Sequence, residues 1–495
     1  MSEADTALPA LHDASLLRVD ALLGGEWVSG PSRFAVHNPA TGTHLADVTS
    51  GDADQARLMV EAAERALPSW RSRSARERGL LLSRWAQLLR QNADDLAQLM
   101  TAEQGKPLAE ARGEVSYAAS FLEWYAEEGK RVYGETIPSS DGNKRQWVWR
   151  QPVGVCAAIT PWNFPLAMIT RKVAPALAAG CTVMVKPAEQ TPLTALACAE
   201  LALRAGLPAG VLAVLPANAD DSIAVGQVWC AHPGVRHLSF TGSTEVGRIL
   251  MAQCAPTLKR LSMELGGHAP FIVFDDADLD SAVEGAVQAK YRNSGQTCIS
   301  ANRLLVQAGI HDAFVERLAE RVAALHLGPG TQAGVQVGPV IDASALAKVK
   351  AHVDDALALG ATARVGGQVR GDLGPTFFEP TLLVGVTPKM RCAVEETFGP
   401  VAPVLRFDTE AQALALANAS EYGLAAYFYS RDIGRVIRLA EALEYGMVGV
   451  NTGLISSAEL PFGGVKQSGF GREGGHHGLE EYLDTKLVCV GDVNA

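Results

Sequence analysis

The sequence predicts an α/β protein with two packed units, and three observations support that prediction. The chain has 495 residues, whereas a single hydrophobic core stops growing at roughly 250–300 residues. Strand-like apolar runs alternate with helix-like runs almost throughout, which is typical of layered folds with largely parallel sheets. From residue 153 to about residue 264 the alternation follows the βαβαβ rhythm of a dinucleotide-binding unit, and a second series begins after residues 270–274.

The elements of the first unit follow from hydrophobic periodicity and from glycine and proline stops. Residues 52–133 are predicted to be helical, because apolar side chains recur every three or four positions. The elements that follow are predicted in this order: a strand over 153–160, a helix over 166–179 that stops at Gly180, a strand over 181–187, a helix over 192–205, and strands over 210–216 and 235–240.

The second unit is predicted from the same kind of pattern. Helices are expected near 279–292, 311–325 and 343–359, and they alternate with the strand-like runs RLLVQ, TLLVGV and PVLRF. The boundary between the two units is expected near Gly266 and Gly267.

Composition excludes several classes of partner. The formal net charge is −11, and an acidic surface is unfavourable for nucleic acid and for anionic membranes. No apolar run reaches the roughly 18–20 residues that cross a bilayer. The longest candidate, 165–185, is interrupted by Arg171 and Lys172. The N-terminal segment has acidic residues and no basic stretch, so it is not expected to be a signal peptide. We therefore expect a cytoplasmic protein with a small-molecule substrate.

The eight cysteines direct attention to one position. They form no CxxC pair and no His/Cys cluster at zinc spacing, so no metal site is expected. Most lie in apolar runs, where cysteines are buried, inert and reduced. Cys298 differs, because NSGQTCIS is typical of a loop, and its thiol is expected to be accessible, unlike the other seven. A thiolate there adds readily to a carbonyl carbon, although a surface thiol without a role fits the same pattern.

Two further residues suit acyl chemistry. Glu264 in MELGGHAP follows a short apolar stretch and is a candidate general base for water. A helix-capping or surface glutamate is the alternative. Asn163 in TPWNFP lies between Pro161 and Pro165, which fix the loop, so its amide is a candidate donor to an oxyanion. A turn asparagine is the alternative.

Two segments predict a nucleotide site. FTGSTEVG places Gly242 and Gly247 between a strand and a helix whose N-terminus would face phosphate, although Thr244 replaces the central glycine of GxGxxG. Lys186 and Glu189 in VKPAEQTP stand at the carboxyl end of a strand, where nucleotides bind in open α/β sheets. A carboxylate there accepts ribose hydroxyls and repels a 2′-phosphate, so NAD is expected rather than NADP. A solvated loop pair is the alternative.

The ordered motifs resemble those of the aldehyde dehydrogenase superfamily. Seven motifs carry the resemblance, which runs from about Trp27 to the C-terminus: PWNFP, VKPAEQTP, FTGSTEVG, ELGG, GQTC, EETFGPV and PFGGVKQSG. The resemblance implies an aldehyde dehydrogenase-like α/β fold with a Rossmann-type cofactor domain, a second α/β catalytic domain and a small β oligomerisation element. The implied domains are 1–139 with 154–265 for the cofactor, 266–477 for catalysis, and 140–153 with 478–495 for oligomerisation.

The resemblance also implies roles for the matching residues. Cys298 is the expected nucleophile, Glu264 the general base and Lys172 part of a proton relay, while Asn163 and the backbone N–H of Cys298 form the oxyanion hole. The expected cofactor contacts are Thr160, Pro161, Trp162, Lys186, Glu189, Gly242, Ser243, Gly247, Leu265, Glu396 at the nicotinamide ribose, and Phe398 beside the ring. The thiolate would add to an aldehyde, the oxyanion would expel hydride to the nicotinamide, and water would hydrolyse the thioester.

Within the superfamily the sequence most resembles the succinate-semialdehyde dehydrogenases. Arg171 in ITRKV, Arg292 in YRNSGQTC and Ser456 in LISSAELPFGG match residues that this subfamily places at the substrate carboxylate. Two arginines and a hydroxyl would clamp a carboxylate at the far end of a short aldehyde. The alternative roles are structural. Arg171 would lie on a helix surface, and Arg292 would lie in the last turn of a helix, where its charge interacts favourably with the helix dipole.

Other activities fit part of this pattern. Glutarate semialdehyde and 2-oxoglutarate semialdehyde would suit the same clamp, because each carries a carboxylate and an aldehyde a few atoms apart. An inactive structural relative is disfavoured, because Cys298, Glu264 and Asn163 are all present. A CoA-acylating enzyme is disfavoured because Glu264 favours hydrolysis.

The sequence departs from the subfamily pattern at two positions, and it predicts assembly. Ser300 stands where many members carry a second cysteine, which puts a local disulfide switch in doubt, and His268 replaces the asparagine common in ELGGNAP. Residues 144–150 and 482–490 resemble strands that the family uses between subunits, so a homo-oligomer is expected, a tetramer built from dimers.

Overall fold

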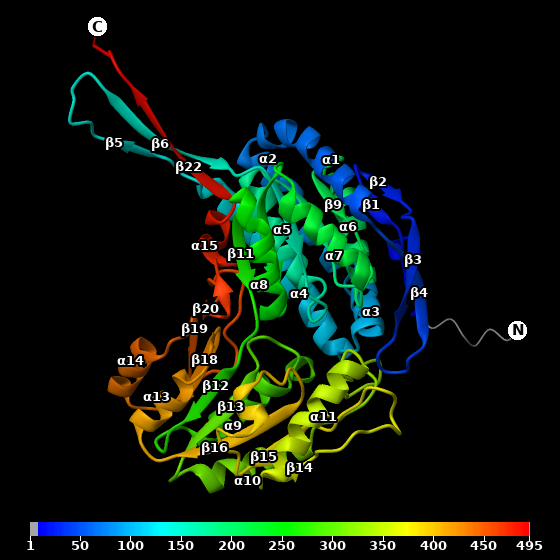
Figure 1. Cartoon of the computed structure of the whole chain (residues 1–495), viewed down its shortest axis with the longest axis vertical. Helices are drawn as coiled ribbons and strands as arrows, with labels where there is room; N and C mark the ends of the chain where they lie inside the picture. The colour runs from blue at the N-terminus through cyan, green and yellow to red at the C-terminus, as the bar shows by residue number, and fades with distance from the viewer. Residues whose placement is uncertain (1–7, 495) are drawn as a thin grey trace, which may run out of the picture.

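The computed structural model describes residues 8–494, which form two sheet-centred lobes with an arm of strands projecting from the first lobe (Figure 1). The N-terminal segment discussed above lies partly outside this range. Each lobe packs helices against a sheet whose central strands are parallel, and each has its own apolar core. The predicted α/β class with two packed units is therefore confirmed.

The first lobe is built on the predicted βαβαβ segment. Its parallel strands are β7 (Val155–Ile159), β8 (Thr182–Lys186), β9 (Leu212–Val214), β10 (Val235–Thr241) and β11 (Arg260–Glu264). Numbered along the chain, these strands stand in the order 3-2-1-4-5, which is the Rossmann arrangement. The edges of the sheet are antiparallel strands: β1 (Ala21–Leu23) and β2 (Glu26–Val28) on one side, and β21 (Gly469–Phe470) on the other.

The helices of this lobe include α1 (Ala53–Arg71), α2 (Ala75–Gln91), α3 (Ala93–Gln104), α4 (Leu108–Glu128), α5 (Ala167–Ala179), α6 (Pro192–Ala205), α7 (Ala219–Ala231) and α8 (Thr244–Cys254). The helices predicted over 166–179 and 192–205 are confirmed to within one residue. Every residue of α5 is buried, because it packs closely against α4 and also contacts the sheet. Gly180 ends it in the left-handed conformation, at φ 101°.

The second lobe contains a sheet with the strand order β14-β15-β16-β13-β12-β18-β19. Its strands are β12 (Ala269–Val273), β13 (Ala301–Gln307), β14 (Thr362–Val365), β15 (Thr381–Val384), β16 (Val401–Phe407), β18 (Ala425–Tyr429) and β19 (Met447–Val450). Only β14 is antiparallel to its neighbour. The helices are α9 (Leu279–Tyr291), α10 (His311–Ala323), α11 (Ala343–Ala358), α12 (Arg391–Val394), α13 (Glu410–Asn418) and α14 (Ile433–Ala442). The predicted helices and the strands at RLLVQ, TLLVGV and PVLRF are confirmed.

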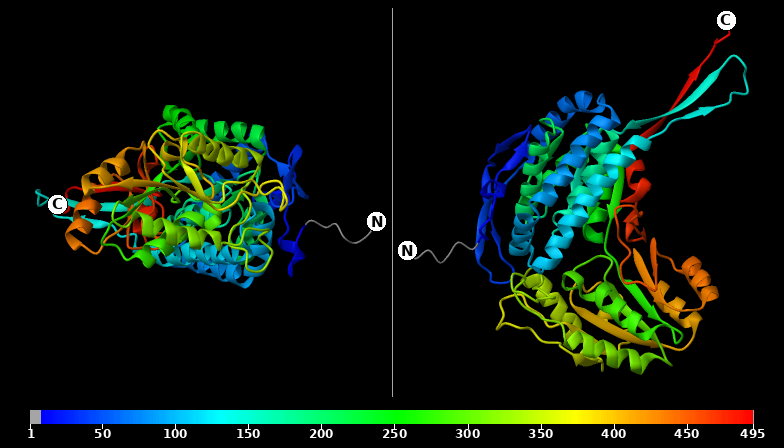
Figure 2. Two further views of the ribbon diagram at one scale, coloured as in Figure 1. Left: turned by 90° about the horizontal axis from the view of Figure 1, so that it is seen from below. Right: turned by 180° about the vertical axis from the view of Figure 1, so that it is seen from behind.

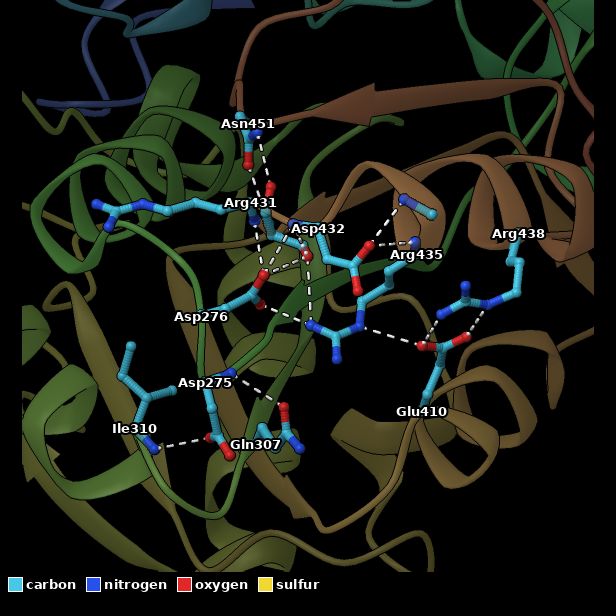
Figure 3. A network of polar contacts seen from close by, with 12 residues as sticks. Asp275, Asp276, Gln307, Ile310, Glu410, Arg431, Asp432, Arg435, Arg438 and Asn451 are labelled. Carbon is cyan, nitrogen blue, oxygen red and sulfur yellow. Dashed lines mark hydrogen bonds and ion pairs between the residues drawn. The ribbon is translucent and has the colours of Figure 1, made fainter.

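A polar network fastens α14 to the loop after β12 (Figure 3). Asp276 accepts hydrogen bonds from the backbone N–H groups of Arg431 and Asp432. It also pairs with Arg435 at 2.6 Å, and Arg435 reaches Glu410 at 3.1 Å. Isolated surface ion pairs stabilise a fold little, but shared charges of this kind hold the start of α14 against the sheet.

The third sheet is the antiparallel arm, formed by β5 (Glu135–Ile137), β6 (Arg145–Pro152) and β22 (Leu483–Val490). β6 and β22 pair along their whole length, from Leu483 opposite Pro152 to Val490 opposite Arg145. The arm projects away from both lobes in Figure 1 and in the right-hand view of Figure 2. The strands expected near 144–150 and 482–490 are therefore present, and they pair with each other.

The remaining elements are short. They are a hairpin of β3 (Ser32–His37) and β4 (His44–Ser50), the paired strands β17 (Tyr422–Gly423) and β20 (Val465–Lys466), and α15 (Gly475–Glu480). Among residues 8–494 no helix combines the length and apolar character that a bilayer crossing requires.

The cysteines correct one expectation. Six of the eight are buried and Cys298 is partly exposed, but Cys489 on the arm is also exposed. The apolar run around Cys489 belongs to a two-sided strand outside any core, so burial does not follow there from local hydrophobicity. The expectation that Cys298 alone is accessible is therefore wrong.

Candidate active site

A deep cleft opens where the first sheet reverses its strand order. β7 and β10 are neighbours there, and residues from the loops after both strands line the cleft. Two cavities of about 470 and 630 Å³ lie at this point, and they share the five residues Pro161, Trp162, Thr241, Gly242 and Ser243. Together they form one elongated site of a size that suits a dinucleotide.

The smaller cavity extends toward the second lobe. Asn163, Leu265, Cys298, Glu396 and Phe398 line it. Glu396 accepts a hydrogen bond from the Gly267 N–H at 3.0 Å. Burial raises the pKa of Glu396 to about 7, and that hydrogen bond opposes the rise. Phe398 takes a positive φ of 54°, and its ring meets the Trp162 ring edge-on with centroids 5.5 Å apart.

The larger cavity runs along α7 and α8. It is lined by Thr160, Lys186 and Glu189, and the last two form an ion pair of 3.7 Å. Burial lowers the pKa of Lys186, and the Glu189 carboxylate opposes this. Ser243 also caps α8, since its hydroxyl accepts a hydrogen bond from Val246 N–H. The cap directs the helix N-terminus, with its partial positive charge, at the cavity.

Gly247 lies apart from these contacts. It lines neither cavity, and a Cβ atom at this position would come within 2.5 Å of Leu265. The missing side chain therefore gives Leu265 the room to occupy the wall of the cleft.

Cys298 lies where a third cavity meets the cleft. This narrow cavity, of about 30 Å³, is lined by Tyr117, Phe164, Met168, Arg171, Arg292, Thr297, Cys298, Ile299, Ser456 and Phe462. Cys298 lines both this cavity and the smaller part of the cleft. A thiol at that junction can reach a group held in either space. The three residues predicted to clamp a carboxylate, Arg171, Arg292 and Ser456, are brought together here.

Arg171 is held in the cavity wall by a buried counter-charge. Its Nε lies 2.6 Å from Glu473 Oε2, and its guanidinium stacks 4.0 Å from the centroid of the Phe462 ring. Arg171 Nη2 is buried and has no hydrogen-bond partner among the described residues. Arg292 stands 5.5 Å from the Phe164 ring centroid and forms no ion pair within those residues. Buried donors without an acceptor are costly, so the cavity is suited to an anionic group.

Ser456 is hydrogen-bonded to Tyr117 through the two hydroxyl groups. One O–H group is used in this contact whichever residue donates, so one O–H group of the pair remains for a ligand. Tyr117 was not singled out from the sequence, where it stands in a helical apolar run with other aromatic residues.

Glu264 lines none of these three cavities and faces a buried group of charges instead. Its Oε1 lies beside Gly463, where a Cβ atom would approach it to 2.8 Å. Lys172 Nζ lies 2.5 Å from Glu473 Oε1 and donates to Ser239 at 2.9 Å. Burial and the Glu473 charge raise the pKa of Glu264 well above its ordinary value. Glu473 keeps a lowered pKa despite burial, because Arg171 and Lys172 contact it directly. The two cations therefore stabilise the ionised form of Glu473 more than the ionised form of Glu264.

The loop that carries Cys298 has an unusual backbone. Asn293, Ser294 and Gly295 have successive positive φ values of 51°, 57° and 73°. Burial raises the pKa of the Cys298 thiol to about 12, and the Arg171 charge opposes this. The thiol is therefore protonated in the resting site.

Donors for an oxyanion lie next to the thiol. Asn163 Nδ2 donates to the Gln296 carbonyl oxygen at 3.0 Å, which leaves its second N–H group for a ligand. The Cys298 backbone N–H forms no hydrogen bond within the described residues. Both groups border the smaller part of the cleft.

His268 follows the glycine pair and is buried, with no hydrogen bond to its ring nitrogens from another side chain. Burial and the nearby Arg303 charge lower its pKa well below the ordinary value, so the ring is neutral. Its carbonyl accepts from Arg303 Nη2 at 2.8 Å. Nothing in the structure explains the replacement of asparagine by histidine here. No cluster of metal-ligating side chains occurs in residues 8–494.

The sequence profile of the Aldehyde dehydrogenase family matches residues 27–488, which is most of the chain. The chain belongs to the aldehyde dehydrogenase family. Together with its similarity to the relatives below, this makes it an NAD(P)-dependent aldehyde dehydrogenase of the succinate-semialdehyde dehydrogenase-like type, and the residues lining the cleft fit such a cofactor.

Three relatives of this aldehyde dehydrogenase are similar over almost their whole length. Succinate-semialdehyde dehydrogenase [NADP(+)] GabD of Escherichia coli K12 is 57% identical, covering 97% of this chain and 99% of the relative. A glutarate-semialdehyde dehydrogenase of Pseudomonas aeruginosa is 57% identical, covering 98% of this chain and 100% of the relative. A 3-sulfolactaldehyde dehydrogenase of Pseudomonas putida is 58% identical, covering 98% of this chain and 99% of the relative. The crystal structure of succinate-semialdehyde dehydrogenase from Burkholderia pseudomallei superposes with a TM-score of 0.96 at 57% identity, covering 98% and 100%.

Succinate- and glutarate-semialdehyde dehydrogenases resemble this aldehyde dehydrogenase equally, at 57% identity. Sequence reasoning missed three residues around the site: Glu473, Tyr117 and Phe462. Glu473 stands alone between glycine-rich segments, and no local pattern marks it as the partner of Arg171 and Lys172. Phe462 carried a weak signal, since it lies within the motif PFGGVKQSG, whereas Tyr117 lies far along the chain from every assigned motif.

Proposed function

We propose that this enzyme oxidises succinate semialdehyde to succinate with NAD, through a thioester on Cys298. One observation carries the proposal: a narrow cavity that ends at the Cys298 thiol is lined by two arginines, one of which has a buried N–H group with no partner. A short aldehyde with a distal carboxylate would satisfy that donor. Its carbonyl carbon would then lie at the thiol.

Arg171 and Arg292 bind the carboxylate in this proposal, and Ser456 adds a hydroxyl. Charge-assisted hydrogen bonds to a carboxylate are about twice as strong as neutral ones, and a cavity with apolar walls strengthens them. Glu473 keeps the guanidinium of Arg171 in place, because their ion pair is buried. Phe164 and Phe462 form walls that suit the methylene groups of the chain.

Cys298 is the nucleophile and must lose its proton first. The Arg171 charge favours the thiolate, and the thiol releases its proton to solvent water before the substrate fills the site. The thiolate adds to the carbonyl, and the oxyanion accepts hydrogen bonds from Asn163 Nδ2 and from the Cys298 N–H. A bound nicotinamide cofactor supplies the acceptor for the hydride.

Glu264 is the base for hydrolysis of the thioester. Its carboxylate faces the buried charges of Lys172 and Glu473, so the side chain must turn toward Cys298 to activate water. Its raised pKa makes it a stronger base once ionised. Lys172 borders the same group of charges, and it completes the path by which a proton leaves.

The cofactor contacts proposed are the residues that line the cleft, from Thr160, Lys186 and Glu189 at one end to Glu396 and Phe398 at the other. Glu189 supports NAD, because a carboxylate facing a 2′-phosphate is repulsive. The E. coli relative uses NADP by its name, so overall identity does not decide the cofactor.

Assembly is proposed from the arm. Trp149, Leu487 and Val490 on its two long strands are exposed, at 49%, 64% and 40%. Exposed apolar strands favour pairing with another chain. We assign residues 140–153 and 478–495 to this oligomerisation element, with the cofactor domain and catalytic domain as predicted. The expected assembly is a tetramer built from dimers.

The test of function is a comparison of kcat/KM over matched aldehydes. Succinate semialdehyde should exceed butanal, which has the same number of carbons and no charge, by at least about a hundredfold. The same series includes glutarate semialdehyde, 2-oxoglutarate semialdehyde and 3-sulfolactaldehyde, because these differ from succinate semialdehyde in chain length or in the anionic group. Equal values for succinate semialdehyde and butanal would refute the clamp. Product formation without CoA would exclude an acylating enzyme.

A further inference from the structure

A buried ion pair lies behind the proposed oxyanion donor, and neither of its residues belongs to the proposed catalytic groups. Lys106 Nζ stands 2.5 Å from Glu114 Oε2, and both side chains are 1% exposed. Lys106 also lies 4.1 Å from the centroid of the Phe164 ring, in the wall of the substrate cavity. Burial lowers the pKa of Lys106, and the Glu114 charge opposes this.

Both partners direct their remaining hydrogen bonds at the loop that carries Asn163. Lys106 Nζ donates to the Asn163 carbonyl oxygen at 2.8 Å. Glu114 Oε1 accepts from the backbone N–H groups of Leu166 and Ala167 at 3.0 and 3.2 Å. These are the first amides of α5, which has no side-chain cap of its own. A carboxylate at a helix N-terminus is favourable, so Glu114 supplies the cap from another helix.

The same carbonyl joins the Asn163 loop to the Cys298 loop. Asn293 Nδ2 donates to the Asn163 carbonyl oxygen at 2.8 Å. That oxygen therefore accepts one hydrogen bond from the Lys106 ammonium group and one from the Asn293 amide. Asn163 Nδ2 in turn donates to Gln296 at 3.0 Å. The backbone N–H of Asn293 is held by Glu110 Oε2 at 2.8 Å. The strained turn at Asn293 persists because these bonds over-determine it.

Stability alone does not account for this arrangement. A buried ion pair commonly contributes little compared with apolar residues of similar volume, because desolvation offsets the attraction. Apart from the bond between them, however, every side-chain hydrogen bond of this pair ends on the backbone that orients Asn163. A displacement of a catalytic donor by about 1 Å can cost a hundredfold in rate.

We propose that Lys106 and Glu114 are positioning residues that fix the backbone of Asn163 and thereby aim its side-chain amide at the oxyanion. The inference rests on the proposed role of Asn163 in the oxidation. It adds the residues that hold this donor in register with the Cys298 thiol.

The experiment measures the burst rate of NADH formation, divided by the number of titratable Cys298 thiols. Lys106→Met and Glu114→Gln should each lower this rate about ten- to a hundredfold on both succinate semialdehyde and butanal, because the oxyanion forms on every aldehyde. NAD binding should change less than about twofold. Arg90→Met, which breaks an exposed ion pair between α2 and α4, is the control and should leave the rate unchanged.

A double-mutant cycle separates positioning from a structural role. In an Asn163→Ala background, Lys106→Met should cause no further loss, because the group that it positions is gone. Additive losses, or a wild-type rate per thiol in Lys106→Met, would overturn the proposal. If Lys106→Met does not fold, Asn293→Ala removes the second donor to the same carbonyl and should show the same non-additivity. A normal rate in Asn163→Ala itself would instead refute the proposed role of Asn163.

Discussion

Glu473 lies 2.6 Å from Arg171, and this buried ion pair connects the wall of the substrate cavity to the charges around Glu264. The contact keeps the arginine ionised and oriented before substrate arrives. It also assigns the negative charge of the group to Glu473, which leaves Glu264 with a raised pKa. In the proposed reaction, one carboxylate thus bears on both substrate binding and hydrolysis.

The first prediction concerns the carboxylate clamp. Arg171→Gln and Arg292→Gln should each lower kcat/KM for succinate semialdehyde about ten- to a hundredfold, because a charge-assisted hydrogen bond contributes roughly 1.5–3 kcal/mol. Ser456→Ala should cost less, since a neutral hydroxyl contributes about 0.5–1.5 kcal/mol. Butanal is the control and should be nearly unaffected. Equal losses on both substrates would show that the arginines support the fold of the Cys298 loop rather than the carboxylate.

The second prediction concerns the pH dependence of hydrolysis. Glu473→Gln removes a negative charge that raises the pKa of Glu264, and it leaves Arg171 and Lys172 to stabilise the Glu264 carboxylate. The pKa of Glu264 should fall, so the ionised base is present at lower pH. The acidic limb of the deacylation rate should therefore move to lower pH, measured by single-turnover kinetics on titrated enzyme. An acidic limb that stays at the same pH or moves to higher pH would contradict the influence of Glu473 on the pKa of Glu264.

The third prediction separates the two halves of the reaction. Cys298→Ala should abolish dehydrogenase activity, whereas Cys489→Ala, which removes the exposed thiol on the arm, should not change it. Glu264→Gln should give a burst of NADH and then a slow steady state, because acylation needs the thiolate and deacylation needs the base. Stopped-flow absorbance checks both. A steady state close to wild type in Glu264→Gln would mean that another group activates water.

The fourth prediction concerns the cofactor. The ratio of kcat/KM with NAD to that with NADP should exceed one, and Glu189→Ser should narrow it, because the ion pair with Lys186 is lost and a 2′-phosphate meets no carboxylate. Glu26→Ser on β2 changes an exposed acid outside the cavity and serves as the control. Equal or better activity of the unmodified enzyme with NADP would contradict the assignment.

The fifth prediction concerns assembly. Light scattering at micromolar concentration should give the mass of a tetramer. Leu487→Lys with Trp149→Ser, on paired strands of the arm, should reduce that mass, because the apolar contact area is lost. Far-ultraviolet circular dichroism checks that the lobes stay folded. A monomer before any substitution would refute the role of the arm.

Much of the fold was predictable, because hydrophobic periodicity and turn residues act over short distances in the chain. The helices over 166–179 and 192–205 illustrate this, since Gly180 and Pro192 mark their limits by backbone geometry alone. The exposure of Cys489 was not predictable in this way. The run Leu487–Val490 around it has the composition of a core strand but belongs to a strand that pairs outside either lobe.

The sequence by itself determined the family, through seven motifs in order, and it identified Cys298, Asn163 and Arg171 as candidates. Only the tertiary structure decided which charges meet them. Glu473 contacts Lys172 across 301 positions of the chain, and Tyr117 meets Ser456 across 339. Contacts over such separations depend on tertiary packing, and no local propensity encodes them. The ionisation of Glu264 follows from the same packing, because burial and neighbouring charges set its pKa.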